Sequence, residues 1–71
     1  MVNDGPLTPR QLEVAALVAD GLTDREIAAA LYIATRTAES HVEQILARLG
    51  YRSRAQVAGW MARRASAAVP R

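Results

Sequence analysis

The sequence lacks cysteine, phenylalanine and lysine, and it contains a single histidine, His41. The absence of cysteine excludes disulfides and thiolate metal sites, and one histidine alone excludes a metal cluster built from several. No apolar run approaches the ~18 residues of a membrane span, and no signal peptide is recognisable. We therefore expect a cytoplasmic protein with no metal, no other cofactor and no contact with a membrane.

Groups that could carry catalysis are equally scarce. The chain has no glycine-rich phosphate loop and no nucleophile paired with a base. His41 has no acid or nucleophile in a recognisable pattern around it, so a packing role is favoured over catalysis or ligand binding. We expect that this chain is not an enzyme and that it holds no small-molecule ligand.

Large rings are limited to Tyr32, Tyr51 and Trp60, although 51% of the 71 residues are hydrophobic. Most of these are alanine, leucine, valine and isoleucine. A composition rich in alanine and poor in aromatics favours closely packed helices over a β-sandwich or barrel. A chain of this length forms one small domain with a modest core, and we expect its fold class to be all-α.

Charge is distributed unevenly along the chain, although the net value is only +2. Every positive charge is an arginine, and every acidic residue precedes position 44. The remaining part carries six arginines with no acid to offset them: Arg48, Arg52, Arg54, Arg63, Arg64 and Arg71. A cationic half of this kind suits a phosphate-bearing partner, but it is equally compatible with a solvated surface.

Helix boundaries are signalled strongly. Thr8-Pro9-Arg10-Gln11 combines an N-cap threonine, a proline at the first helical position and a glutamine that completes a capping box. Thr23-Asp24-Arg25-Glu26 and Ser53-Arg54-Ala55-Gln56 have the same form. Gly21 and Gly50 stand where helices should end, because glycine readily adopts the left-handed conformation of a C-cap.

These signals predict helices over residues 9–20, 24–31, 35–49 and 54–65. The folded domain is then 7–65, preceded by a linker remnant at 1–6 and followed by a disordered tail at 66–71. Only about three residues join the second and third helices, and the second of the pair is the longer. This arrangement is typical of a helix-turn-helix, here within a compact four-helix bundle.

The third predicted helix has two distinct faces at 100° per residue. Its apolar arc consists of Ala38, Val42, Ile45 and Leu49, with Leu46 at the edge. The opposite face consists of Arg36, Ser40, Glu43 and Ala47, flanked by Glu39 and Gln44. Such an outward face could be received by a DNA major groove about 12 Å wide, or it could simply be solvated.

Several segments together resemble the LuxR-type (GerE-type) DNA-binding domain of bacterial transcription regulators. The resemblance extends over about residues 7–62. It is carried by Leu7-Thr8-Pro9-Arg10, Glu13-Val14, Gly21-Leu22-Thr23-Asp24-Arg25-Glu26-Ile27-Ala28, Thr37, His41-Val42, Ile45-Leu46, Leu49-Gly50 and Arg52-Ser53-Arg54-Ala55-Gln56. It implies sequence-specific binding to double-stranded DNA by the C-terminal domain of a transcriptional regulator. Such domains bind inverted-repeat sites as homodimers.

The resemblance also implies roles for individual residues. Base contacts are expected from Arg36, Glu39, Ser40 and Glu43. Contacts to the phosphate backbone are expected from Arg25, Thr37, Arg48 and Arg52. The fourth helix should supply the dimer contact, with Gln56, Trp60 and Arg63 as candidates. Trp60 could equally be a core ring packed under the first helix, and we expect the isolated domain to be a monomer.

The sequence departs from the family pattern at three places. Ala34 stands where the family usually has the serine or threonine that caps the third helix, so the cap must come from Thr35 or be missing. Ala38 replaces a usual valine. Glu39 and Glu43 occupy positions that often carry lysine or arginine, and two acids there weaken attraction to phosphate. The alternative is therefore a helical protein-interaction module whose acidic face docks a basic partner.

Overall fold

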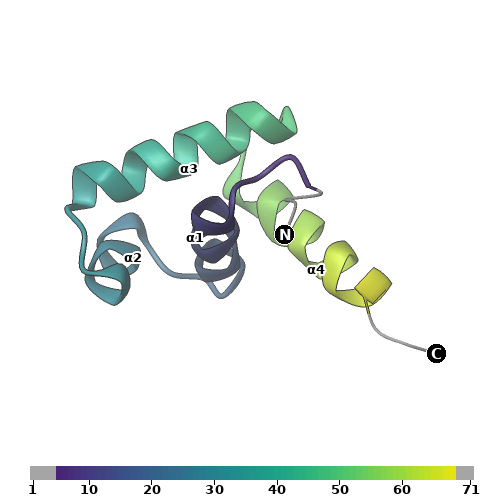
Figure 1. The fold of residues 1–71 in the computed structure, drawn as a ribbon, viewed down its shortest axis with the longest axis horizontal. Helices are drawn as coiled ribbons and strands as arrows, with labels where there is room; N and C mark the ends of the chain where they lie inside the picture. The colour runs from purple at the N-terminus through teal and green to yellow at the C-terminus, as the bar shows by residue number, and fades with distance from the viewer. Residues whose placement is uncertain (1–4, 69–71) are drawn as a thin grey trace.

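The computed structural model describes residues 5–68, which contain four helices and no strand. These are α1 (Pro9–Ala19), α2 (Asp24–Leu31), α3 (Thr35–Leu49) and α4 (Arg54–Ala68), as Figure 1 shows. The predicted all-α class and the order of the helices are confirmed. Helix α4 runs three residues past its predicted end at 65. The linker prediction for 1–4 and the tail prediction for 69–71 lie outside the described residues.

Capping boxes begin three of the helices, as predicted. At α1 the Thr8 hydroxyl accepts from the Gln11 backbone N–H at 3.1 Å, and the Gln11 side chain accepts from the Thr8 backbone N–H at 3.0 Å. Thr23 and Glu26 form the same pair at α2. Ser53 and Gln56 form the corresponding pair of hydrogen bonds at α4. These local bonds satisfy backbone donors that have no partner inside the helix.

Helix α3 begins without such a cap. Its N-cap residue is Ala34, and no side chain accepts from the first backbone N–H groups. The preceding turn is reached through Tyr32, which adopts the left-handed conformation at φ 59° and ψ 44°. A residue with a Cβ atom is disfavoured in this conformation by roughly 1–2 kcal/mol. The turn between α2 and α3 therefore contains two locally unfavourable features, the missing side-chain cap and the left-handed tyrosine. Packing between the helices must stabilise it.

The core lies where α1, α2, α3 and α4 converge. Buried apolar side chains come from the segment before α1 and from all four helices, namely Leu7, Val14, Ala15, Val18, Ile27, Ala28, Ala38, Val42, Ile45 and Val57. Helix α1 packs against α3 and α4, while α2 packs against α3. The predicted inward arc of α3 is confirmed at its three buried members, whereas Leu49 is only half-buried. Packing on one side leaves the other side of α3 exposed.

A charged contact fastens the start of α4 to the start of α2. The Arg54 guanidinium lies 2.6 Å from the Asp24 carboxylate and also donates to the Leu22 carbonyl oxygen at 2.5 Å. One of the arginines in the cationic half of the chain is thereby used inside the fold. Both of its terminal nitrogens already donate within the domain.

Candidate nucleic-acid interface

The exposed face of α3 brings together all four residues predicted to contact bases. Arg36, Glu39, Ser40 and Glu43 line one shallow depression. Three of them are exposed, and Ser40 is half-buried. The four positions recur at the spacing of a single helix face. The sequence prediction that these side chains lie side by side is therefore confirmed, while the contacts that they make with a ligand remain a prediction.

Helices α1 and α2 pack against the buried side of α3. Helix α3 has 15 residues, which corresponds to a length of about 22 Å. Figure 1 shows it lying across the top of the molecule, with α2 below its beginning and α1 below its middle. A helix about 10–12 Å across fits the width of a DNA major groove. The arrangement of α2 and α3 is that of a helix-turn-helix with its second helix accessible.

The four phosphate-contact candidates are all exposed, and they lie on three different segments. Arg25 belongs to α2, Thr37 and Arg48 to α3, and Arg52 to the α3–α4 loop. The Arg48 Nε donates to the Pro6 carbonyl oxygen at 2.9 Å. Within residues 5–68, the guanidinium groups of Arg25 and Arg52 take part in no hydrogen bond or ion pair. These two cations are free to meet an external anion.

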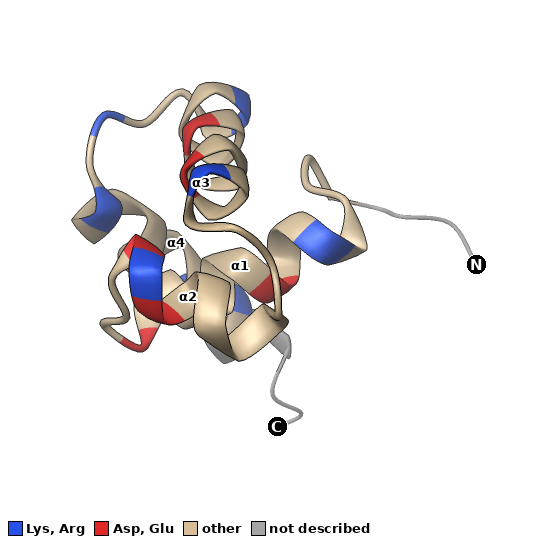
Figure 2. Ribbon diagram, turned by 90° about the vertical axis from the view of Figure 1, so that its left-hand side faces the viewer, with Lys and Arg blue, Asp and Glu red and all other residues tan. Residues whose placement is uncertain are grey.

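Charges of both signs are interleaved on this side of the molecule. Figure 2 shows both blue and red segments on α2 and on α3. On α3, Arg36 and Arg48 lie on either side of Glu39 and Glu43 in the sequence. The face is therefore not a uniformly basic patch, and its attraction to phosphate depends on the arginines at its borders.

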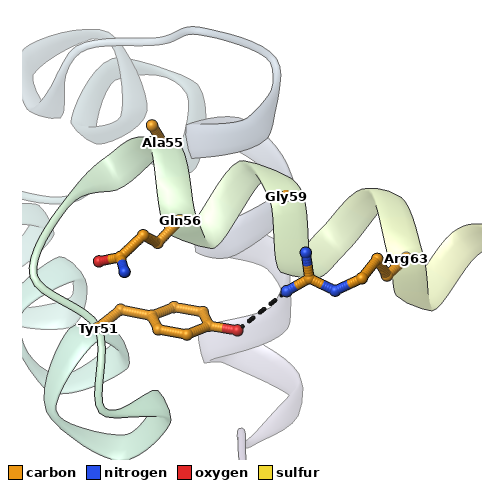
Figure 3. Close-up of a pocket in the computed structure, with 5 residues that line it drawn as sticks. All are labelled: Tyr51, Ala55, Gln56, Gly59 and Arg63. Carbon is orange, nitrogen blue, oxygen red and sulfur yellow. Dashed lines mark hydrogen bonds between the residues drawn. The ribbon is translucent and has the colours of Figure 1, made fainter.

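The dimer-contact candidates on α4 do not form one surface. Gln56 and Arg63 line a depression with Tyr51, Ala55 and Gly59, shown in Figure 3. Arg63 Nη2 donates to the Tyr51 hydroxyl at 3.1 Å, and the Gln56 side chain is occupied in capping α4.

Trp60 does not line this depression. Its ring is half-buried against the hydrophobic core, and the Arg64 guanidinium lies 5.6 Å from the ring centroid. The sequence left open whether Trp60 is a dimer contact or a core ring. Its contacts within the domain are those of a ring packed against the core.

Two glutamines make a contact that the sequence did not reveal. Gln11 is buried, with 7% of its surface exposed, and its Nε2 donates to the Oε1 of Gln44 on α3 at 3.3 Å. The capping motif identified the first function of Gln11 but carries no signal for the second, because the two glutamines are distant in sequence. His41 is half-buried, as a packing role predicts, and its buried Nδ1 has no hydrogen-bond partner among the described residues.

Neither a metal site nor a membrane span is found in the described part of the chain. Across residues 5–68 no group of three or more histidine, cysteine, aspartate or glutamate side chains is placed to hold a metal ion. In the same range, no helix has both the length and the apolar character needed to cross a bilayer.

Comparison with known proteins points to one class. The family model described as "Bacterial regulatory proteins, luxR family" matches residues 5–61. A putative HTH-type transcriptional regulator of Mycobacterium tuberculosis is 40% identical over 62 residues, which is 87% of this chain and 7% of that protein. The transcriptional regulatory protein LiaR of Bacillus subtilis is 40% identical over 52 residues, covering 73% of this chain and 25% of LiaR.

The response regulator protein VraR of Staphylococcus aureus is also 40% identical, over 50 residues that cover 70% of this chain and 24% of VraR. The chain thus spans a quarter or less of the length of these relatives. The fold and the exposed second helix of the pair define a helix-turn-helix domain of the DNA-binding, transcription-regulating class. Within that class, the chain belongs to the luxR family of bacterial regulatory proteins.

Proposed function

We propose that this domain binds double-stranded DNA sequence-specifically, with α3 in the major groove. The observation that carries the proposal is the depression on α3 lined by Arg36, Glu39, Ser40 and Glu43. Arg36 suits the O6 and N7 acceptors of guanine, which an arginine can contact with two hydrogen bonds. Glu39 and Glu43 can accept only, and the cytosine N4 amino group is a matching donor.

Phosphate contacts position the helix in the groove. Arg25, Arg48 and Arg52 supply the cations, and Thr37 supplies a hydroxyl near the start of α3. Contacts of this kind set register and orientation without reading sequence. Three neutralised phosphates give a decrease in log K of about 2.7 per unit of log salt concentration, at ~0.9 per contact.

The isolated domain should bind weakly. Glu39 and Glu43 are both exposed, and neither forms an ion pair within the described residues, so their charges repel the phosphates that border the groove. The first backbone N–H groups of α3 lack a side-chain cap, which typically costs about 1 kcal/mol of helix stability. Most of the affinity therefore comes from the arginines around the depression rather than from within it.

We propose further that the domain works within a longer regulator and binds an inverted-repeat site as a homodimer. Its relatives named above are at least several times longer than the matched segment. The depression on α4 lined by Gln56 and Arg63 supplies the contact between copies. One such small surface is insufficient for a stable dimer on its own, so the isolated domain is a monomer in solution.

The test is selection of bound sites from random duplex DNA, followed by fluorescence anisotropy at increasing salt. Sequence-specific binding gives an enriched motif and a linear fall of log K with log salt. If neither a motif nor any binding is obtained at low salt, the proposal is wrong. The exposed Glu39 and Glu43 would then favour the other candidate function, a module that docks a basic protein surface.

A further inference from the structure

A chain of three hydrogen bonds links the backbone at the start of α1 to the exposed face of α3. The Thr8 backbone N–H donates to Gln11 Oε1 at 3.0 Å, and Gln11 Nε2 donates to Gln44 Oε1 at 3.3 Å. Gln44 Nε2 in turn donates to Ser40 Oγ at 3.5 Å. Ser40 also lines the depression on α3. A helix outside the helix-turn-helix is thereby connected to one of the four base-contact candidates.

The Thr8 backbone N–H determines how the side-chain amides of Gln11 and Gln44 are oriented in this series of hydrogen bonds. A backbone N–H can donate but cannot accept, so Thr8 holds the Gln11 side chain with its oxygen toward the backbone. The NH2 group of Gln11 then faces Gln44, and since Gln11 is buried, this group requires an acceptor. Gln44 meets the requirement by presenting its own oxygen. Its NH2 group is left to face Ser40, whose oxygen accepts.

The consequence appears at the Ser40 hydroxyl. A serine hydroxyl has a single hydrogen to donate, and the Gln44 NH2 group offers it no acceptor. The hydrogen is thus available to point away from Gln44. In the major groove, guanine and thymine present only acceptors at their distinctive positions, whereas cytosine presents only an N4 amino donor. A Ser40 hydroxyl with this orientation favours guanine or thymine over cytosine, although its second lone pair can still accept from the cytosine amino group.

We infer that Gln11 and Gln44 are positioning residues that orient Ser40 as a hydrogen-bond donor toward a base acceptor. The inference rests on the proposed function, in which this face of α3 enters the groove. It assigns a part in base selection to Gln11, a residue of α1 that lies in the core and touches no base. It also distinguishes Ser40 from Glu39 and Glu43, which can only accept when ionised.

Gln11→Glu is the sharpest test. Either carboxylate oxygen can accept, so the Thr8 N–H keeps its partner, and glutamate at this position still completes a capping box. The second carboxylate oxygen now requires a donor from Gln44. The Gln44 amide therefore turns over, its oxygen faces Ser40, and the Ser40 hydrogen is drawn inward. Ser40 then presents only lone pairs to the groove, and the preference shifts from guanine toward cytosine.

Gln44→Glu should produce the same shift toward cytosine, because its second carboxylate oxygen accepts the Ser40 hydrogen directly. The exposed position of Gln44 makes loss of folding less of a concern there than at buried Gln11. A net hydrogen bond of about 1 kcal/mol corresponds to a roughly fivefold change in the guanine-to-cytosine ratio of affinities. The matched control is the Ser40→Ala background, in which neither glutamate substitution should change that ratio. Each glutamate still lowers affinity for all sequences, because it adds a negative charge.

The measurement is anisotropy competition on the selected site, with each of the four bases placed in turn at the pair that Ser40→Ala affects. Circular dichroism checks that each variant is folded.

Without DNA, NOEs from the Gln44 side-chain amide protons to the Ser40 β-protons are expected in the unaltered domain. In Gln11→Glu these NOEs should weaken, and NOEs from the same protons to residue 11 should strengthen.

The outcomes separate the two claims. If the unaltered domain binds no DNA with sequence preference, the proposed function fails and the inference fails with it. If the domain binds specifically but the guanine-to-cytosine ratio is unchanged in both glutamate variants, the positioning role is overturned and the proposed function stands. A shift in this ratio that persists in the Ser40→Ala background would also overturn it, because the effect would not pass through Ser40.

Discussion

Arg54 joins the start of α4 to the start of α2 by contacting Asp24, with 2.6 Å between Nη1 and Oδ1. The same guanidinium donates to the Leu22 carbonyl oxygen, so one side chain satisfies both a carboxylate and a backbone acceptor. The paired side chains are only 38% and 30% exposed. This partial shielding separates the contact from an ordinary surface ion pair, which contributes about 0–1 kcal/mol.

Removing the Arg54 side chain should therefore destabilise the fold. For Arg54→Ala we expect the free energy of unfolding to fall by about 1–3 kcal/mol, because a charged hydrogen bond is lost and a carbonyl is left unpaired. Urea denaturation followed by circular dichroism measures the change. Arg10→Ala is the matched control, since Arg10 pairs with Glu13 at 3.0 Å but with side chains 45% and 60% exposed. Equal losses in the two variants would contradict the prediction.

The uncapped start of α3 offers a stabilising substitution. Ala34 has extended backbone at φ −69° and ψ 149°, which is the conformation of an N-cap residue. Ala34→Thr should raise the free energy of unfolding by about 1 kcal/mol, because its hydroxyl can accept from a free N–H group. Ala34→Val has the same shape without the hydroxyl and should give no such gain. A shift of thermal midpoint shared by both variants would show that the cap is not its cause.

Features encoded by neighbouring residues could be predicted from the sequence, and those that depend on distant residues could not. The capping boxes at Thr8, Thr23 and Ser53 are complete within four residues, and the inward arc of α3 follows from helical spacing. By contrast, Arg54 and Asp24 are 30 residues apart. No local pattern distinguishes such an arginine from one that is free to meet a phosphate.

Two further features of the structure were not predicted from the sequence. Helix α4 continues to Ala68 because Ala67 and Ala68 are strong helix formers, and the next strong stop signal in the sequence is Pro70, which disfavours helical backbone at the residue before it. The left-handed conformation of Tyr32 was not predicted, because the usual glycine or asparagine signal is missing. Its side chain is 95% exposed, so burial does not compensate for the conformation.

Arginines inside and outside the depression on α3 should affect binding differently. Arg36→Ala should reduce discrimination at one base pair by about 1–3 kcal/mol, because Arg36 lies among the base-contact candidates. Arg48→Ala should weaken binding to all sequences alike and lower the salt slope by about 0.9. Anisotropy on the selected site and on scrambled DNA, at several salt concentrations, separates the two effects. The same loss of discrimination in both variants would mean that Arg36 reads no base.

The two acids of α3 should limit affinity. Glu39→Gln and Glu43→Gln retain the shape of the side chain and remove one negative charge each. We expect each to raise affinity for scrambled DNA at low salt by about two- to fivefold, in line with exposed charge interactions of 0.2–1 kcal/mol. Glu13→Gln, at an exposed position of α1 outside the depression on α3, is the control and should have a smaller effect. An unchanged affinity in both α3 variants would indicate that this face lies away from the DNA.

The depression on α4 should govern how many copies occupy an inverted repeat. Arg63 lines it and donates to the Tyr51 hydroxyl, so Arg63→Glu removes this hydrogen bond and reverses the charge on both sides of a two-fold contact. We expect this variant to bind a single half-site as before but to lose cooperative binding to the full repeat, as measured by sedimentation of the complexes. Arg64→Glu makes the same change of charge one residue further along, beside Trp60 and outside the depression. If both variants lose the second copy equally, the effect arises from charge on α4 in general, and the proposed contact surface is wrong.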